Sequence, residues 1–355
     1  MEIEEFTQYV IVKAQETGTS DIHILPEDTQ YRFYFRIGGK MSFWNAVTED
    51  EGKRFISYFK YLANMDVGER RKPQSGAAQL IVEEKTVALR FSTITNFRSQ
   101  ESMVIRILNQ SMHVSLAKTT YFKREVKLIE QLAQFNSGLL IFSGPVGSGK
   151  TTTMYQLIRE SYLTSKQQVI TVEDPVEIEE PLFLQTQVNE KAGITYETLL
   201  KSSLRHHPDI IIIGEIRDEE TAKMVIRGAL TGHLIIASVH AKNTIGVISR
   251  LLELGVTQEQ LKQTLLGVVF QKLIPRYCSF CKGDCVPACS HIELSEKRAI
   301  LYDVLSRNEL KQYLNQTQTE EQIQKKQTRS FNLLLRKAYA YGYISGKNFI
   351  QFQIP

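Results

Sequence analysis

The sequence lacks a long apolar run and a signal peptide, and each absence excludes a class of protein. No apolar stretch approaches the roughly 20 residues that a membrane-spanning helix needs. The longest candidate, residues 265–274, is interrupted by Gln271 and Lys272. The chain starts with the acidic run MEIEE, without the charged and then apolar order of a signal peptide. We therefore expect a cytoplasmic protein that contacts the inner face of the cell membrane only peripherally.

An excess of one charge is also missing, since 43 basic and 39 acidic residues leave a net charge of only +4. A dedicated nucleic-acid-binding protein more often concentrates basic residues on one face. The shares of hydrophobic residues, 42%, and of charged residues, 23%, are ordinary for a soluble globular protein. At 355 residues the chain is long enough for two domains, each with its own core.

The first part of the chain, residues 1–108, has the pattern of a small α+β domain. Apolar residues at helical spacing alternate with short runs in which every second residue is apolar. The expected elements are a helix that ends near residue 18, a strand over 31–37, a helix over 51–64, and strands over 87–93 and 103–108. Residues 109–120 are polar and break the pattern, so we expect a linker there.

The remaining residues, 121–355, alternate helical patterns with continuous apolar strands. These strands are expected at residues 139–142, 169–172, 210–213 and 234–237. Strands that are apolar on both faces indicate a mostly parallel sheet covered by helices on each side. The sequence therefore predicts an α/β domain, followed after about residue 295 by a helical tail in which residues 315–330 form a solvated helix or loop.

The most informative segment is residues 144–151, which fits the pattern G-x-x-x-x-G-K-[ST]. An apolar strand precedes it and a helical pattern follows it, as a phosphate-binding loop requires. Lys150 is expected to reach the β- and γ-phosphates, and Thr151 to offer its hydroxyl to Mg²⁺. The predicted ATP-binding residues are Gly144, Pro145, Val146, Gly147, Ser148, Gly149, Lys150, Thr151 and Thr152. A chance match to a glycine-rich turn is the alternative, which the flanking strand and helix disfavour.

Acidic residues follow two of the other predicted strands, at the edge where ligands of open parallel sheets bind. Glu173 and Glu177 come after the strand over 169–172, and Glu215 and Asp218 come after the strand over 210–213. Carboxylates beside a phosphate site suit Mg²⁺ coordination and water activation. The alternative is that they cap the following helices. Both interpretations suit Asp218 and Glu177, whereas the motif context favours a site role for Glu215 and Glu173.

Four segments, taken in their order along the chain, resemble the motifs of the secretion ATPase superfamily, the hexameric motors of type II secretion and type IV pili. The segments correspond to the family's Walker A, Asp box, Walker B and His box, at residues 144–151, 172–177, 208–218 and 231–240. The first domain carries matching runs at residues 20–24, 68–76, 90–93 and 104–106. The resemblance implies a RecA-like P-loop domain and a smaller, PAS-like α+β domain before it.

Within the superfamily the chain most resembles the competence-pilus ATPases of Gram-positive bacteria. It begins close to the run SDIHI, and its segment 65–74 is close to the corresponding segment of the competence-pilus ATPases. Its cysteine segment is shortened as it is in those proteins. This resemblance implies a hexamer that hydrolyses ATP to assemble a pilus for DNA uptake. The implied partners are a polytopic inner-membrane platform protein and, indirectly, pilin-like subunits, with no direct binding of nucleic acid.

The resemblance also implies roles for single residues. Glu215 takes the place of the Walker B carboxylate that polarises the attacking water. Gly214 stands where many P-loop enzymes have a magnesium-binding Asp, so Glu215 and Glu173 would share that duty. His240 would sense the γ-phosphate, with His233 nearby.

The family places charge-stabilising arginines on the first domain. Arg90 and Arg106 lie on adjacent predicted strands and are the best candidates, ahead of Arg36 and Arg71. If they act, ATP binds between domains and hydrolysis moves one domain against the other. Arginines that alternate along a half-buried strand also suit a solvated face, which is the alternative.

All four cysteines, Cys278, Cys281, Cys285 and Cys289, fall within one short segment. In a cytoplasmic protein such a cluster favours a structural zinc ion over disulfides, and Cys278-x-x-Cys281 is a common zinc knuckle. The spacing of the second half is irregular, and His291 is a possible substitute ligand. Free thiols and a disulfide stay open as alternatives.

Two other functions are compatible with a P-loop core. One is a hexameric DNA translocase or helicase, although the sequence shows no basic and aromatic stripe for single strands. The other is an ATP-gated scaffold with vestigial turnover, which would not need the carboxylates of Glu173 and Glu215.

Overall fold

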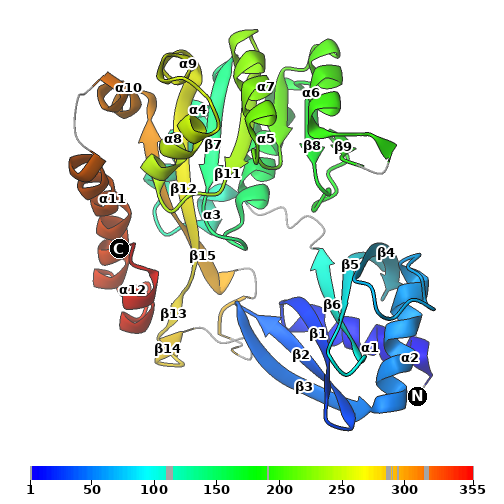
Figure 1. Cartoon of the computed structure of the whole chain (residues 1–355). Coiled ribbons are helices and arrows are strands. Elements are labelled where there is room, and N and C mark those ends of the chain that lie inside the picture. The colour runs from blue at the N-terminus through cyan, green and yellow to red at the C-terminus, as the bar shows by residue number, and fades with distance from the viewer. Residues whose placement is uncertain are drawn as a thin grey trace. The chain divides into compact units, whose positions relative to one another are not determined.

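A computed structural model describes residues 2–108, 115–189, 192–284, 289, 291–293, 296–315 and 320–354 (Figure 1). The chain forms two compact units, one mainly from residues 1–112 and the other mainly from residues 113–355. The predicted linker, 109–120, lies partly outside the described residues, and its described part contains the short helix α3 (Leu116–Thr119). The expected domain boundaries at residues 108 and 120 stay a prediction.

The first unit is a six-stranded antiparallel sheet with two helices. The helices are α1 (Ile3–Glu16) and α2 (Glu49–Leu62). The strands, in the spatial order β3-β2-β1-β6-β5-β4, are β1 (Thr19–Glu27), β2 (Gln30–Ile37), β3 (Lys40–Thr48), β4 (Gln74–Val82), β5 (Lys85–Thr95) and β6 (Glu101–Leu108). The buried faces of both helices join the apolar face of the sheet in one core, with Phe6, Phe33 and Phe55 in ring contact.

The second unit is built on a seven-stranded sheet in the order β15-β12-β7-β11-β10-β8-β9. Its strands are β7 (Gly138–Ser143), β8 (Val169–Glu173), β9 (Leu184–Gln187), β10 (Ile210–Ile213), β11 (Leu234–Val239), β12 (Leu265–Pro275) and β15 (Arg298–Ser306). All neighbouring pairs are parallel except β12 with β15. A small hairpin of β13 (Tyr277–Cys278) and β14 (Gly283–Asp284) follows β12.

Helices cover both faces of this sheet. Alternate residues of each central strand enter two separate cores, so that Ile211 faces one and Ile212 the other. The first core contains residues of α6 (Tyr196–Arg205), α7 (Glu219–Leu230), α8 (Thr244–Glu253), α9 (Gln258–Thr264) and α10 (Arg307–Asn315), and the second those of α4 (Lys123–Leu132) and α5 (Lys150–Ser165). The predicted fold class, an α/β domain with a smaller α+β domain, is confirmed.

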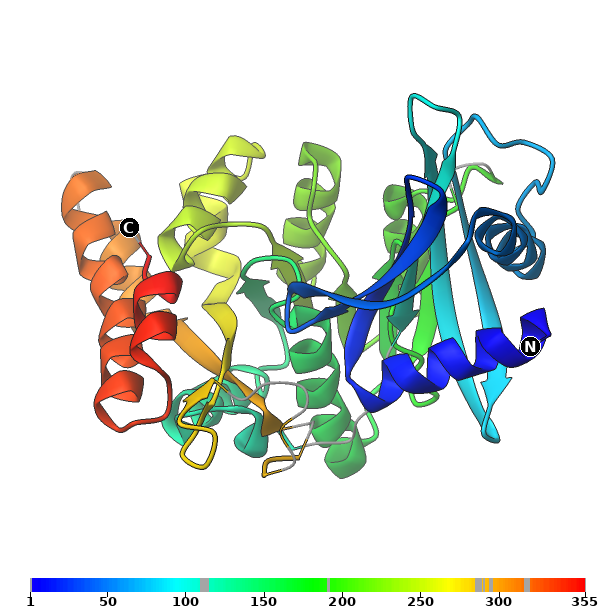
Figure 2. The same ribbon diagram turned by 90° about the horizontal axis from the view of Figure 1, so that it is seen from below.

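The end of the chain differs from its prediction. A helical tail was expected after about residue 295, but residues 298–306 form β15, which pairs antiparallel with β12 from Gly267 opposite Ser306 to Pro275 opposite Arg298. The strand hydrogen-bonds the free edge of β12, and its consecutive apolar residues Ala299, Ile300, Leu301 and Tyr302 are all buried. Only then do α10, α11 (Glu320–Ala340) and α12 (Gly346–Phe352) follow, with α12 beside α11 (Figure 1, Figure 2). Among the described helices, none combines the length and apolar character needed to cross a bilayer.

Candidate active site

The loop over residues 144–149 joins the end of β7 to the start of α5, as its motif predicts. Gly144, Gly147 and Gly149 have positive φ angles of 147°, 75° and 83°. A Cβ atom on Gly144 would lie 2.2 Å from the main-chain oxygen of Gln271, so no side chain fits there. The loop therefore wraps the amino end of α5, where backbone N–H groups bind anions.

Lys150, the first residue of α5, folds back over this loop. Its Nζ donates hydrogen bonds to the carbonyl oxygens of Gly144 at 3.0 Å and Pro145 at 3.4 Å. Burial lowers the pKa of Lys150, and the negative charges of Glu215 and Glu177 oppose that shift. The ammonium group therefore lies in the field of two carboxylates from separate loops.

Thr151 is next to the carboxylate of Glu177, for which the sequence left a helix-capping role and a role in the site equally open. Its Oγ1 donates to Oε2 of Glu177, in the loop after β8, at 3.1 Å. A hydroxyl and a carboxylate oxygen in contact are the hard oxygen ligands that Mg²⁺ prefers. The residues at this point fit a magnesium ion, with Thr151 and Glu177 as the groups that would hold it.

Glu215, after β10, is the centre of a charged cluster. Nε2 of His240, after β11, lies 3.4 Å from Glu215 Oε1. Arg217 Nε donates to the other carboxylate oxygen at 2.8 Å, and its Nη1 reaches Asp174 Oδ2 at 3.1 Å. Hydrogen bonding to Glu215 raises the pKa of Arg217. The structure thus brings together the Walker B and His box residues expected from the sequence.

Two buried serines fix the distances between these loops. Ser143, the last residue of β7, accepts a hydrogen bond from Ala241 N at 3.1 Å and donates to Ala241 O at 3.3 Å. Ser238 Oγ donates to Gly214 O at 2.5 Å, and Ser238 O accepts from Ile216 N at 2.9 Å. Because these contacts join three loops through the backbone, the side chains of Glu215 and His240 are held on the same edge as the phosphate loop.

Glu173 has different surroundings from those expected of a magnesium ligand. Its side chain is buried, and Oε1 accepts hydrogen bonds from Tyr155 OH and from Thr171 Oγ1, the latter at 2.7 Å. Burial raises the pKa of this carboxyl group. A hydrogen bond to the backbone of Glu177 links the same carboxylate to the loop that reaches Thr151. Glu173 therefore supports that loop from the interior.

His233 does not lie near His240, and this expectation is wrong. His233 precedes β11 and His240 follows it, so a six-residue strand of roughly 20 Å separates them. His233 Nδ1 lies 3.2 Å from Thr231 Oγ1. The side chain lines a polar cavity of about 300 Å³ at the amino ends of the strands, away from the phosphate loop.

The candidate arginines belong to the first unit. Arg90 of β5 and Arg106 of β6 are direct partners across adjacent strands, as expected. Arg106 Nε donates to Asp21 Oδ1 at 2.9 Å, and Arg36 Nε lies 3.9 Å from the other oxygen of that carboxylate. Arg71 is in a surface loop, where its backbone N–H donates to Glu69.

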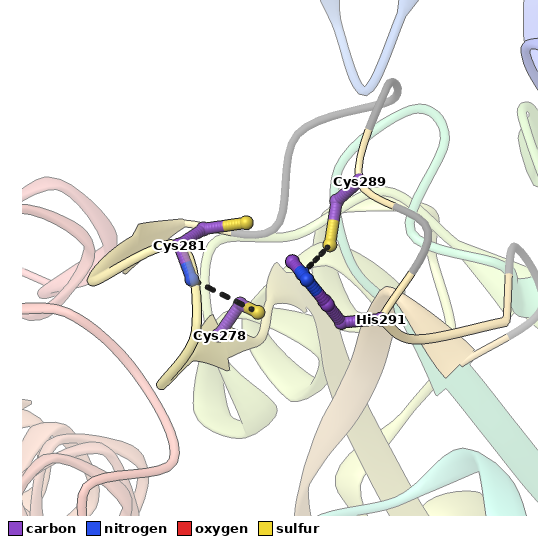
Figure 3. A group of neighbouring side chains, drawn as sticks. All are labelled: Cys278, Cys281, Cys289 and His291. Atoms are coloured by element: carbon purple, nitrogen blue, oxygen red, sulfur yellow. Dashed lines mark hydrogen bonds between the residues drawn. The ribbon is translucent and has the colours of Figure 1, made fainter.

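Three of the four cysteines are within the described residues, and they meet a histidine (Figure 3). The ligand atoms of Cys278, Cys281, Cys289 and His291 all lie within 4.8 Å of one another. Cys289 Sγ is 3.4 Å from His291 Nδ1, and Cys281 N donates to Cys278 Sγ at 3.5 Å. Three thiols and one imidazole are a common donor set of structural zinc sites, so these residues fit that ion. Cys285 lies outside the described residues.

The model of the family described as "Type II/IV secretion system protein" matches residues 1–350. The chain belongs to this family. Competence protein ComGA of Bacillus subtilis (strain 168) is 38% identical to it over 347 residues, covering 98% of this chain and 97% of that protein. Competence protein ComGA of Streptococcus pneumoniae (strain ATCC BAA-255 / R6) is 43% identical over 275 residues, covering 77% and 85%. The predicted resemblance to secretion and competence ATPases is confirmed.

Two solved structures share the fold of this chain. The ATPase DotB of Legionella pneumophila matches 98% of this chain and 94% of its own with a TM-score of 0.76 and 18% identity. The pilus retraction motor PilT with bound ADP matches 97% and 96% with a TM-score of 0.69 and 23% identity. With its family membership and a complete phosphate-binding loop, the chain is an ATPase that uses a nucleotide and Mg²⁺, as the sequence predicts.

Sequence reasoning assigned no role to three polar residues of this site. Arg217 and Asp174 stand inside the quoted motifs, and the position of Arg217 two residues after Glu215 was the available signal. Gln271 was noticed only as an interruption of an apolar run. A single polar residue in the middle of such a run is itself a signal, because burying it is unfavourable without a hydrogen-bonding partner.

Proposed function

We propose that the chain is a hexameric ATPase that powers the assembly of a competence pilus, of the type IV kind, for DNA uptake. The observation that carries this proposal is the convergence of Lys150, Thr151, Glu177, Glu215 and His240 at one edge of one sheet. The similarity to proteins named as competence proteins, over 98% of this chain for one and 77% for another, supports pilus assembly as the work that ATP hydrolysis drives.

Each residue of the site has its own role in the proposed hydrolysis of ATP. The loop N–H groups and Lys150 bind the phosphates of ATP and oppose the charge that builds up during phosphoryl transfer. Glu215 polarises the attacking water, while Arg217 and His240 hold the carboxylate in place. Magnesium held by Thr151 and Glu177 would supply positive charge to the phosphate oxygens. Glu173 acts on these groups through the loop that carries Glu177.

Arg90 and Arg106 are proposed to supply positive charge to the nucleotide of a neighbouring subunit in the ring. An arginine in this role stabilises the charge on the transferred phosphoryl group by several kcal/mol. The proposed partner is a polytopic inner-membrane platform protein, which passes the work on to pilin-like subunits. The protein would act at the inner face of the membrane and bind no nucleic acid directly.

We also propose that Cys278, Cys281, Cys289 and His291 hold a structural zinc ion. The compact arrangement of the four ligand atoms supports this ion. Metal analysis of the purified chain should give about one zinc per chain, and Cys278→Ser should lower that ratio. A ratio near zero in the unmodified protein would contradict the proposal.

Steady-state ATP hydrolysis, with and without DNA, tests the proposed motor. Slow turnover that Lys150→Ala abolishes and that DNA leaves unchanged is the expected result. Strong stimulation by DNA would instead support a DNA translocase. If the protein hydrolyses no ATP, either alone or with membranes that contain the platform protein, the result would support an ATP-gated scaffold.

A further inference from the structure

Gln271 is a fully buried amide in the middle of β12. The strand runs beside β7, and the preceding residue, Phe270, is the partner of Ser143, where β7 ends and the phosphate loop begins. An amide in such a position is unfavourable unless it forms hydrogen bonds. The place of Gln271 beside the loop therefore needs a physical explanation.

The contacts of Gln271 are with the two ends of the phosphate loop. Its Nε2 donates to the carbonyl oxygen of Ser148 at 2.7 Å. Its main-chain oxygen occupies the space beside Gly144, where a Cβ atom would come within 2.2 Å. Its Oε1 and the hydroxyl of Ser148 are buried without a hydrogen-bonding partner among the described residues. One residue of β12 thus touches the loop at its start through its main chain and near its end through its side chain, and only the second contact requires a side-chain donor.

The contact with Ser148 sets the direction of a neighbouring N–H group. In a trans peptide the C=O and N–H bonds point in opposite directions. Since Gln271 holds the Ser148 carbonyl toward β12, the N–H of Gly149 in the same peptide points away from β12. Gly149 is the N-cap of α5 and has the left-handed φ of 83°, so this peptide is at the point where anions bind.

We propose that Gln271 is a positioning residue that keeps the phosphate-binding loop in the form that binds the nucleotide. This inference rests on the proposed ATPase site. Without the hydrogen bond, the peptide between Ser148 and Gly149 can rotate, so that the binding form is populated only part of the time. The apparent dissociation constant then rises by the inverse of that population. ADP and ATP are affected equally because both have the β-phosphate, and kcat at saturation is unchanged.

The test uses Gln271→Met, which keeps the shape and removes the donor, and Gln271→Glu, which places an acceptor against the Ser148 carbonyl. Calorimetric titration of the full chain with Mg-ADP should show a Kd raised roughly 5- to 10-fold for Met, and more for Glu. The KM for ATP should rise in parallel, with kcat within about twofold. The control is Asn332→Leu, which removes another amide-to-carbonyl hydrogen bond, from Nδ2 to Ile354 O at 2.8 Å, together with the bond that Oδ1 accepts from Ile354 N at 2.9 Å.

The outcomes separate this inference from the proposed function. Folded Gln271→Met with the Kd of the unmodified protein would overturn the positioning role, as would a fall in kcat with KM unchanged. An equal rise of Kd in Asn332→Leu would show a general effect of stability and would also overturn it. Failure of the unmodified protein to bind Mg-ADP would contradict the nucleotide site itself.

Discussion

Glu173 is the last residue of β8 and Glu177 lies in the loop that follows, but the two carboxylates have opposite surroundings. Glu177 meets the hydroxyl of Thr151 on the open side of the loop. Glu173 is enclosed by Tyr155 and Thr171 in the interior. Because a metal ligand needs oxygen lone pairs that the ion can reach, the two carboxylates should differ in their effect on magnesium.

We expect Glu177→Gln to raise the Mg²⁺ concentration for half-maximal ATP hydrolysis by about tenfold or more, since it removes a charge beside Thr151. Glu173→Gln keeps an oxygen for Tyr155 and Thr171, so the same concentration should change less than about twofold. Titration of hydrolysis with Mg²⁺ measures both. The reverse order of the two variants would show that Glu173 is the ligand.

At the scale of secondary structure, β15 brings a buried carboxyl group to the interface with α11. Asp303 Oδ1 accepts a hydrogen bond from Ser330 Oγ at 2.7 Å, and Oδ2 has no hydrogen-bonding partner among the described residues. Burial raises the pKa of Asp303 to about 7, and the charges of Glu309 and Glu125 act in the same direction. The packing of these elements therefore prefers the neutral acid.

This preference predicts how stability depends on pH. Below the unfolded pKa near 4 the group is protonated in both states. Between that value and the folded pKa the native state binds more protons, so the contribution of Asp303 to the free energy of unfolding falls as pH rises, by about 4 kcal/mol in all. Above about pH 7 the contribution is constant.

Asp303→Asn should remove this pH-dependent fall in the free energy of unfolding. The stability of the variant relative to the unmodified chain should therefore rise between pH 5 and pH 7.5. Denaturant unfolding at the two pH values measures the difference. Glu296→Gln, an exposed acid near the start of β15, is the control and should show no such gain. An equal pH dependence in Asp303→Asn and the unmodified chain would contradict the burial argument.

At the scale of the whole molecule, three arginines and one carboxylate form a row across the first unit. Arg36, Asp21, Arg106 and Arg90 are successive partners on β2, β1, β6 and β5. Asp21 neutralises one charge of the row, and about half of the Arg106 side chain stays exposed. A row with excess positive charge suits the proposed contact with the nucleotide of another subunit.

Arg106→Ala should lower ATP turnover by about 1,000-fold or more and leave the affinity for Mg-ADP within a few fold, since the arginine acts on the transition state. Steady-state hydrolysis and calorimetric titration give the two values. Arg98→Ala, at an exposed arginine of the same unit, is the control and should keep normal turnover. Normal turnover in Arg106→Ala would remove this residue from the mechanism.

Much of this molecule follows from local pattern in the sequence. The motif over residues 144–151 and the apolar runs beside it predict the phosphate loop, the parallel strands and the edge where Glu215 and His240 meet. These predictions succeed because strand, turn and helix depend on the spacing of neighbouring residues. The family resemblance, which rests on the same motifs, is confirmed over residues 1–350.

Only tertiary structure decides which of these residues touch. It turns Glu177 rather than Glu173 toward Thr151, places His233 at the far end of β11, and adds β15 to the edge of β12 where a helix was expected. It also joins His291 to the cysteines and brings Gln271 to Ser148. Such contacts depend on strand order, register and burial between segments up to 123 residues apart, which the local spacing of residues does not contain.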